Sequence, residues 1–513
     1  MFRGRLVILM AALLAAGLAN AGMMGGGMGG GGCGGGGCGG GGGASVIDPP
    51  VGALLADPVE MPNISTTPGT VEVNVEAKIA PVNINGTTAN LMTYNGRFPA
   101  PTIRVRQGDI LKLHLINSLP STTETNFLGY QKNFTSIHTH GWHVSPLAPS
   151  DYVMYALAPG ETYDHKYDTS MQEPGTLNLY HPHKHGLVAE QFWAGLVGAL
   201  VTADETTLLD KYETHILILK DISLSGSAPA PHSSMMDYMQ GKEGNIIMVN
   251  GQVNPRLYMK AGQVQRWRIL NASNARFYRL SLDSHTMSLI GTDGGLLDKP
   301  YSKSELILSP AERVDVLVKG VKASGSYKFK ALPYSRMGMS GGQTITLMTV
   351  TYKGSQSPAQ NLPASINPNA VRIDPNSVDI MAERTLTLSM GMGQGYINGQ
   401  NFDVDPFMIM SNVNTYELWT IVNQSNMDHP FHQHVNSAQV VSITGGDAGY
   451  ASTYTTTPAW KDVVLIPKGG SATLLVPIMD FTGMTMFHCH ILEHEDIGMM
   501  GMWNIMDMGG GMP

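Results

Sequence analysis

Apolar and polar residues alternate in short stretches from about Val71 onward, as in Val71-Glu-Val-Asn-Val-Glu. An alternation with a period of two predicts half-buried β-strands. The chain shows no helical heptads, and no internal apolar stretch is long enough to cross a membrane. Its 60 glycines and 30 prolines suit short strands that are joined by many turns. The pattern therefore predicts an all-β protein with no membrane span.

Length and charge narrow the class of protein further. The chain has 513 residues, enough for about two to four domains. Charged residues make up only 14% of it, and the formal net charge of −8 comes without a basic block. Proteins that bind nucleic acid usually concentrate positive charge, which attracts the phosphate backbone. The chain shows no such concentration, so we expect no nucleic-acid partner.

Residues 1–21 have the layout of a signal peptide. Arg3 and Arg5 supply the positive region, residues 6–18 are apolar but too short for a bilayer span, and Ala19-Asn-Ala21 fits the small-residue cleavage rule. We expect cleavage before Gly22 and export to the periplasm or the outside of the cell. The alternative is an uncleaved anchor.

Residues 22–60 are expected to form a flexible leader. Its first part, residues 22–43, contains only Gly, Met and Cys. Cys33 and Cys38, with the neighbouring methionines, could bind Cu(I), or the two cysteines could form a disulfide. A linker whose thiols do little explains the same composition, so the role of this segment stays open.

The most informative stretch is residues 488–499, His-Cys-His-Ile-Leu-Glu-His-Glu-Asp-Ile-Gly-Met. A thiolate, an imidazole and a thioether together are the ligand set of a blue-copper site. On a strand, Cys489 points to one face while His488 and His490 point to the other. The stretch thus predicts one copper on the cysteine side and a second metal site on the histidine side. The competing interpretation is a buried cysteine among chance histidines.

Three further histidine clusters argue against chance. They are His-Thr-His-Gly-Trp-His at 138–143, His-Pro-His-Lys-His at 181–185 and His-Pro-Phe-His-Gln-His at 429–434. Each contains a His-x-His pair, which lies on one face of an extended segment. One such pair is weak evidence, but four of them among 17 histidines predict a metal centre.

With these four motifs in this order, the chain resembles the multicopper oxidases over roughly residues 60–508. The resemblance implies four copper ions: one type 1, one type 2 and a binuclear type 3 pair. The residues that match the type 1 ligands are His429, Cys489, His494 and, in the axial position, Met499. Those that match the type 2 ligands are His138 and His432. Those that match the six type 3 ligands are His140, His181, His183, His434, His488 and His490.

Two carboxylates match positions where the family supplies protons. Asp151 follows His138 by thirteen residues, and Glu495 follows His494 directly. Either could instead orient a ligand by accepting a hydrogen bond from its second ring nitrogen, and the two roles are compatible. Asp428 is expected to be structural. His143 and His185 are surplus to the ligand count and are expected near the centre or at the surface.

The resemblance also implies a domain plan and a fold. We expect three Greek-key β-sandwiches of the cupredoxin type in series, with the metal cluster between the first and the last. The expected segments after the leader are a first domain at 61–205, a second at 206–355, a linker at 356–384 and a third domain with a Met-rich tail at 385–513.

The implied function is a laccase-like oxidase that takes single electrons from phenolic or aromatic donors and reduces O2 to water. Electrons would be taken up near the surface, through an exposed His494 or His429. A monomer is the default for the family.

Methionine supports a second hypothesis. The chain has 33 methionines, with groups at 235–239, 337–339, 390–392 and 499–512. Because thioethers favour Cu(I), the protein could instead be a dedicated cuprous oxidase that serves copper tolerance. Methionine as a flexible filler of gaps is the plainer explanation. A copper-sequestering protein without turnover is a third possibility, although a carrier has no need of so many histidine ligands.

Overall fold

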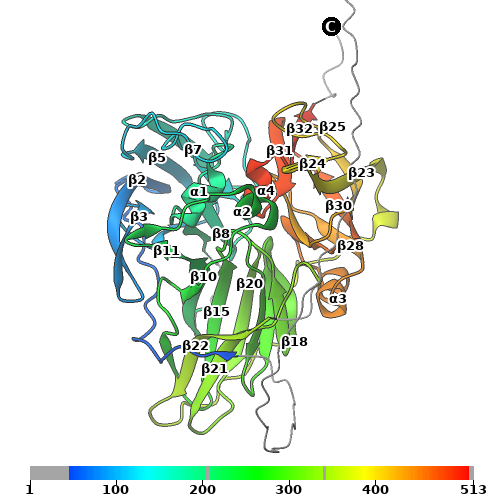
Figure 1. The fold of residues 1–513 in the computed structure, drawn as a ribbon. Coiled ribbons are helices and arrows are strands. Elements are labelled where there is room, and N and C mark those ends of the chain that lie inside the picture. Colours follow the sequence, from blue (N-terminus) through cyan, green and yellow to red (C-terminus); the bar gives the residue numbers. More distant parts are fainter. Residues whose placement is uncertain (1–45, 204–207, 339–341, 508–513) are drawn as a thin grey trace, which may run out of the picture. The chain divides into compact units, whose positions relative to one another are not determined.

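The computed structural model describes residues 46–203, 208–338 and 342–507, and these residues form mostly β-strands with a few short helices (Figure 1). The predicted all-β fold is confirmed. The signal peptide and Cys33 and Cys38 of the leader lie outside the described residues, as do Met339 and the tail beyond residue 507. The predictions for those segments are therefore not addressed by the structure.

The strands form three successive pairs of sheets, which we call the first, second and third sheet pairs. In the first pair, one sheet has the order β3-β2-β5-β7 and the other β4-β9-β8-β6. Their strands are β2 (Thr70–Ile84), β3 (Thr87–Tyr94), β4 (Ala100–Val105), β5 (Ile110–Asn117), β6 (His138–His140), β7 (Thr162–Asp168), β8 (Leu177–His181) and β9 (Gly198–Thr202). Alternate residues of β5, such as Leu111 and Leu113, are fully buried, as a period of two requires.

The second sheet pair comprises two six-stranded sheets and carries none of the four histidine motifs. The strands of one sheet are β10 (Glu213–Ile222), β13 (Ile246–Val249), β15 (Val264–Asn271), β17 (Met287–Thr292), β18 (Gly295–Lys303) and β20 (Arg313–Lys319). Those of the other are β1 (Val46–Ile47), β14 (Arg256–Met259), β16 (Tyr278–Leu282), β19 (Glu305–Leu308), β21 (Ser326–Leu332) and β22 (Thr344–Tyr352). A small hairpin is formed by β11 (Leu224–Ser225) and β12 (Ala228–Pro229).

The third sheet pair holds the two C-terminal motifs. The strands of one sheet are β23 (Ile380–Gly391), β24 (Gln394–Ile397), β26 (Thr415–Asn423), β28 (Gln439–Thr444) and β30 (Ser471–Ile478). Those of the other are β25 (Met408–Asn412), β27 (His429–Gln433), β29 (Val463–Ile466), β31 (Gly483–Cys489) and β32 (Met500–Met506). A single 3₁₀ turn, η1 (Pro375–Ser377), precedes β23.

Three short helices gather where the sheet pairs meet (Figure 1). They are α1 (Val188–Trp193), α2 (Met235–Gln240) and α4 (Leu492–Asp496), and α4 contacts both of the others. The Asp496 carboxylate accepts hydrogen bonds from the backbone N–H of Gly186 and Ala189, at 2.7 and 2.8 Å. N–H groups at the start of a helix have no partner within the helix. By accepting hydrogen bonds from them, Asp496 of α4 joins the first sheet pair to the third.

Arg313, on β20, bonds to all three sheet pairs. Its Nε donates to the carbonyl of Leu177 in the first pair at 2.9 Å, and its guanidinium donates to both carboxylate oxygens of Asp462 in the third, at 2.7 and 2.6 Å. Behind it, Lys461 pairs with Asp293 and Glu312 at 2.6 and 2.7 Å. All of these side chains are buried, so the cluster fixes the three sheet pairs against one another.

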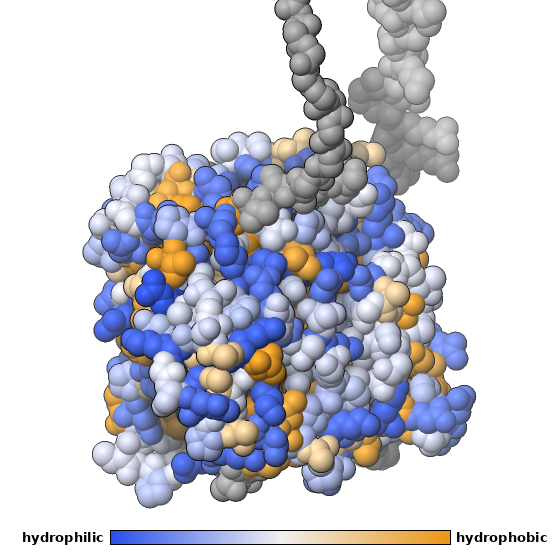
Figure 2. All heavy atoms as spheres, turned by 90° about the horizontal axis from the view of Figure 1, so that it is seen from below, coloured by the Kyte–Doolittle hydropathy of each residue, from blue (hydrophilic) through white to orange (hydrophobic). Residues whose placement is uncertain are grey.

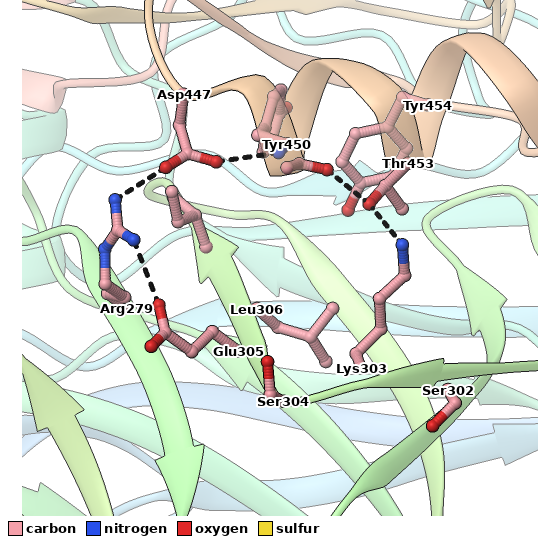
Figure 3. A pocket seen from close by; sticks show the side chains of 12 residues that line it. Arg279, Ser302, Lys303, Ser304, Glu305, Leu306, Asp447, Tyr450, Thr453 and Tyr454 are labelled. Carbon is pink, nitrogen blue, oxygen red and sulfur yellow. Dashed lines mark hydrogen bonds and ion pairs between the residues drawn. The ribbon is translucent and has the colours of Figure 1, made fainter.

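A surface cavity of about 330 Å³ lies between the second and third sheet pairs, beside α3 (Ala448–Thr456) (Figure 3). Arg279 spans it, donating to Glu305 at 3.0 Å and to Asp447 at 2.7 Å. Lys303 donates to Thr453 at 2.7 Å. Its charged groups already have partners, and none of the histidine motifs lines it. The cavity is therefore part of the seam between the two sheet pairs.

The face shown in Figure 2 carries hydrophobic residues scattered among hydrophilic ones, without one large apolar patch among the described residues. Scattered surface apolar residues are normal for a folded protein. Among the described residues, no helix combines the length and the apolar character that a membrane crossing requires.

Candidate metal centres

The four histidine motifs lie on short strands that hold their side chains in register. β6 and β8 pair antiparallel, which sets His138 opposite His181. β27 and β31 pair in the same way, which sets His432 opposite His488. His138 and His140 both lie within β6 and therefore share one face, as the sequence predicts. In the other three pairs, the second histidine follows the end of its strand by one or two residues.

These strands bring eight histidines into one buried cluster, which we call the eight-histidine cluster. Half come from the first sheet pair and half from the third, so the predicted position between the first and last parts of the fold is correct. Ring centroids of His140 and His432 are 3.8 Å apart, and those of His138 and His434 are 4.0 Å apart. Every member is at most 3% exposed. The members are His138, His140, His181, His183, His432, His434, His488 and His490.

Several ring nitrogens of this cluster are buried without a hydrogen-bond partner among the described residues. Buried polar atoms are nearly always paired, so a set of unpaired nitrogens that face one another fits a metal centre. They are Nε2 of His138, His181 and His432, Nδ1 of His140 and His434, and both nitrogens of His490. Imidazole nitrogen is a ligand that copper accepts readily.

Burial also favours the neutral form of several rings of the cluster. It lowers the pKa of His488 to about 3, and it lowers the pKa of His140, His181 and His490 well below the ordinary value. Repulsion between neighbouring histidines adds to the effect. A neutral imidazole offers a lone pair, which is the form that binds a metal.

Within the cluster, several sets of neighbouring histidines could hold a metal ion, and their division among copper ions stays a prediction. The Nε2 atom of His488 lies 3.4 Å from Nε2 of His183 and 3.2 Å from Nε2 of His434. The rings of His140, His181 and His490 form a second group, with centroids 4.8 to 5.6 Å apart. His138 and His432, the predicted type 2 pair, offer nitrogens within 4.8 Å of each other.

A separate set of ligands lies on the other face of β31. Sγ of Cys489 is 3.3 Å from Nδ1 of His429 and 3.6 Å from Nδ1 of His494, and the two nitrogens are 3.2 Å apart. Burial raises the pKa of the Cys489 thiol, so its thiolate requires a positive partner such as a metal ion. Met499 is fully buried, and its backbone bonds to His494 and Cys489 at 2.9 and 3.1 Å. The axial role of its sulfur stays a prediction.

The predicted exposure of His494 or His429 is wrong, because both side chains are completely buried. Nε2 of His494 contacts the carbonyl of Met239 at 3.3 Å, at the end of α2, and Nε2 of His429 contacts Oγ of Ser425 at 2.6 Å. The helix α2, which covers His494, belongs to the part of the chain that forms the second sheet pair. Nothing in the sequence around His494 signals that cover.

Both predicted acids lie beside the eight-histidine cluster. Asp151 accepts from Nδ1 of His138 at 2.7 Å and from Thr139 at 2.9 Å. Burial alone would raise the pKa of Asp151, but these contacts outweigh it and lower the pKa, so the carboxylate is ionised. Glu495 lies 3.2 Å from Nδ1 of His488, and burial raises its pKa well above the ordinary value. Burial therefore favours its protonated form.

Asp462 is a neighbour of the cluster that the sequence did not reveal. Its Oδ1 lies 3.0 Å from Nε2 of His140, and its backbone carbonyl accepts from Nδ1 of His432 at 2.9 Å. It orients two ring ligands at once and is itself held by Arg313. Asp462 lies outside every motif, and only the packing of β20 against the third sheet pair places it here.

The remaining candidates take supporting positions. His143 contacts the carbonyl of Val435 and the Asp480 carboxylate, both at 2.8 Å, and His185 contacts Asp403 at 2.7 Å. Asp428 accepts from the hydroxyl of Tyr334 at 2.6 Å. The contact of Asp428 agrees with the structural role expected of it, and His143 and His185 lie outside the eight-histidine cluster, as expected of surplus histidines.

Comparisons with known proteins agree with this arrangement. Three family models described as multicopper oxidase match residues 76–207, 206–355 and 369–508. The multicopper oxidase mco of Staphylococcus haemolyticus is 29% identical over 428 residues, which cover 80% of this chain and 83% of that protein. The laccase of Bacillus subtilis is 28% identical over 476 residues, covering 81% and 90%. A solved multicopper oxidase of Campylobacter jejuni, described as a metallo-oxidase, has a TM-score of 0.76 at 28% identity, covering 90% of this chain and 98% of that one.

Proposed function

The chain belongs to the multicopper oxidase family of oxidoreductases, and on this basis we propose that it oxidises phenolic and aromatic donors one electron at a time and reduces O2 to water. The observation that carries the proposal is the convergence of eight histidines and, on the opposite face of β31, of His429, Cys489 and His494.

The residues present suit four copper ions. We assign His429, Cys489, His494 and Met499 to type 1, His138 and His432 to type 2, and the other six histidines of the cluster to the type 3 pair. Bound copper would supply the one-electron chemistry, with thiolate and thioether ligands tuning the type 1 ion for electron transfer.

β31 provides a short covalent connection between the two ligand sets. Cys489 belongs to one set, and its sequence neighbours His488 and His490 belong to the other. Because successive side chains of a strand point to opposite faces, three consecutive residues reach both sites. A rigid strand also holds the spacing between the sites constant.

Asp151 and Glu495 have complementary proton states. Reduction of O2 to water consumes protons, which must reach a cluster that solvent does not touch. The protonated carboxyl of Glu495, beside His488, can donate one. The ionised Asp151 orients His138 through Nδ1 and can accept a proton for later transfer.

O2 consumption by the copper-loaded protein, recorded with an absorption spectrum, tests this proposal. A blue absorption band and O2 uptake with a phenol are the expected results. Copper binding without uptake from a phenol or from Cu(I) would instead leave a copper store or carrier.

A second candidate function, cuprous oxidation in copper tolerance, is favoured by the position of α2. This Met-rich helix covers His494, with the carbonyl of Met239 3.3 Å from Nε2 of the ring. Met235 and Met236 are 38% and 59% exposed, and the nearby Met392 is fully exposed. These thioethers could bind Cu(I) close to the type 1 ligands.

Replacement of Met235, Met236 and Met239 by Ser separates the two functions. If α2 delivers Cu(I), oxidation of Cu(I) should fall about 10-fold or more, as for other changes around metal ligands, while phenol oxidation is retained. Met381→Ser, an exposed methionine on β23, is the matched control. Equal losses with both donors would contradict the cuprous role.

The proposed location is the periplasm or the outside of the cell, and the proposed state is a monomer. Both rest on the signal-peptide pattern of residues 1–21 and on the family default. Cell fractionation and light scattering of the purified protein measure them directly.

A further inference from the structure

We propose that a methionine-lined cavity beside the eight-histidine cluster is a Cu(I)-binding site through which copper is loaded into that cluster. The proposal rests on the proposed function in one respect, that the cluster holds copper. The cavity has a volume of about 300 Å³, and its wall includes Met154, Met486, Met500, Phe402, His183 and His185. We call it the methionine cavity.

Burial of the cluster makes a loading route necessary. All eight histidines are at most 3% exposed, so a metal ion from solvent cannot reach their nitrogens directly. His183 belongs both to the cluster and to the wall of the methionine cavity. The cavity therefore reaches a predicted type 3 ligand from the outside.

The strand register places two thioethers next to another type 3 ligand. Met486 and His488 are two residues apart on β31, so their side chains share one face. On β32, Met500 is the direct cross-strand partner of His488. Directly opposed side chains have Cβ atoms only about 5 Å apart. A metal ion held by these thioethers would thus lie beside the cluster.

Exposure falls along the cavity from its mouth to the cluster. Met154 is 41% exposed, whereas Met486 and Met500 are 2% and 1% exposed and pack with Val153 and Phe402. Soft thioether ligands select Cu(I) over harder or more oxidised ions. The order of the three methionines suits stepwise inward transfer of Cu(I), with ligand exchange at each step and no change of oxidation state.

His185 adds a nitrogen ligand to the wall. Its Nε2 lies 2.7 Å from Oδ1 of the Asp403 carboxylate and donates to it, which leaves Nδ1 as the free acceptor. That Nδ1 atom is buried and has no hydrogen-bond partner among the described residues. Methionines that only filled a gap in the core would not require an unpaired nitrogen in the same cavity wall. A metal site would, because the metal ion supplies the missing partner.

Lys184 also lines the cavity, and the carboxylates of Asp403 and Asp496 oppose its positive charge. Cu(I) carries a single charge, so its cost of desolvation is smaller than that of a divalent ion.

The test is the rate at which copper-free protein takes up copper. Cu(I), supplied anaerobically as its acetonitrile complex, and Cu(II) are added in separate experiments, and bound copper is measured over time. In the Met486→Leu/Met500→Leu variant we expect Cu(I) loading of the histidine cluster about 10-fold slower, as for other changes around metal ligands. Cu(II) loading should be unchanged, because thioethers bind it weakly.

Two further variants sharpen the test, one as a control for packing and one at the mouth of the cavity. Leu and Met have similar volumes, so the fold should tolerate the exchange. Met287→Leu/Met348→Leu replaces two fully buried methionines of the second sheet pair and should leave both loading rates unchanged. Met154→Leu, at the exposed mouth, should slow Cu(I) loading without touching the buried core.

The outcomes are distinct. Slower loading with Cu(I) alone supports the methionine cavity as the loading site. Equal rates in all variants, or equal slowing with Cu(I) and Cu(II), would overturn it while the oxidase proposal stands. If the unaltered protein takes up no copper in its histidine cluster, the proposed function itself fails, and the loading site fails with it.

Discussion

At the scale of single residues, side-chain direction on β31 separates the two ligand sets, and this direction follows from the sequence alone. Cys489 lies between two histidines, and the alternation of a strand sends it to the opposite face. Asp462 is the contrasting case, because its contact with His140 depends on chain segments that are far apart in sequence. Local pattern therefore predicted which histidines and which cysteine gather in buried clusters, whereas Asp462 beside them required the packed structure.

Lys220 provides a residue-scale prediction about pH. Its ammonium group is buried, where it donates to the carbonyl of Ala272 at 3.2 Å, and burial lowers its pKa from 10.5 to about 8. Between pH 8 and 10.5 the unfolded chain binds more protons than the folded one, so stability rises with pH across this window.

Lys220→Met should therefore raise the free energy of unfolding near neutral pH. The gain should be at most about 3 kcal/mol, at about 1.4 kcal/mol per pKa unit, and should disappear above pH 10.5. Urea unfolding over a pH series measures it, with the exposed Lys166→Met as control. A gain that does not change with pH would contradict the titration of Lys220 as its cause.

At the scale of elements, α2 covers His494, one of the proposed type 1 ligands. The methionines of α2 stand out in the sequence, but the sequence could not show that this helix ends against His494. A capping box begins the helix: the Oγ atom of Ser234 accepts from the N–H of Asp237 at 3.2 Å, and Asp237 accepts from the N–H of Ser234 at 3.0 Å. A helix of six residues has few internal bonds, so such a cap contributes much of its stability.

Ser234→Ala should loosen this cover. Loss of the cap costs about 1 kcal/mol, which raises the open fraction of α2 about fivefold. We expect kcat/KM to rise for bulky phenols and to change little for small ones. Ser233→Ala is the control, because Ser233 contacts Asp237 through its backbone N–H. The same change for both classes of donor would show that α2 does not limit access.

At the scale of the whole molecule, the described residues of the second sheet pair include none of the proposed ligands, and yet this segment contacts both sites. Its Arg313 holds Asp462, and its α2 segment covers His494. The sequence predicted an all-β fold made of successive domains, and it placed the histidine cluster between the first and the last domain. It did not predict this central role, because a buried ion pair across three sheet pairs leaves no local signature in the chain.

Arg313→Met should destabilise the copper-free protein by about 3 to 5 kcal/mol, because it leaves the buried carboxylate of Asp462 without its ion-pair partner and Asp293 with Lys461 alone. Thermal unfolding measures the loss, and copper content reports on the cluster. Arg279→Met is the matched control at the same seam (Figure 3). The Arg279 side chain is 28% exposed, so its loss should cost about 1 kcal/mol or less. Similar losses for the two variants would contradict the special role of Arg313.

The eight-histidine cluster takes half of its members from strands near residue 140 or 181 and half from strands near residue 432 or 488. During synthesis the ribosome makes the first half long before the second. A nascent or truncated chain therefore carries four of the histidines without the other four. Under the ligand assignment proposed above, none of the copper ions would have its full ligand set before the last strands are made. A chain that loses its C-terminal strands to a protease would lose both sites together, with no partly active remnant.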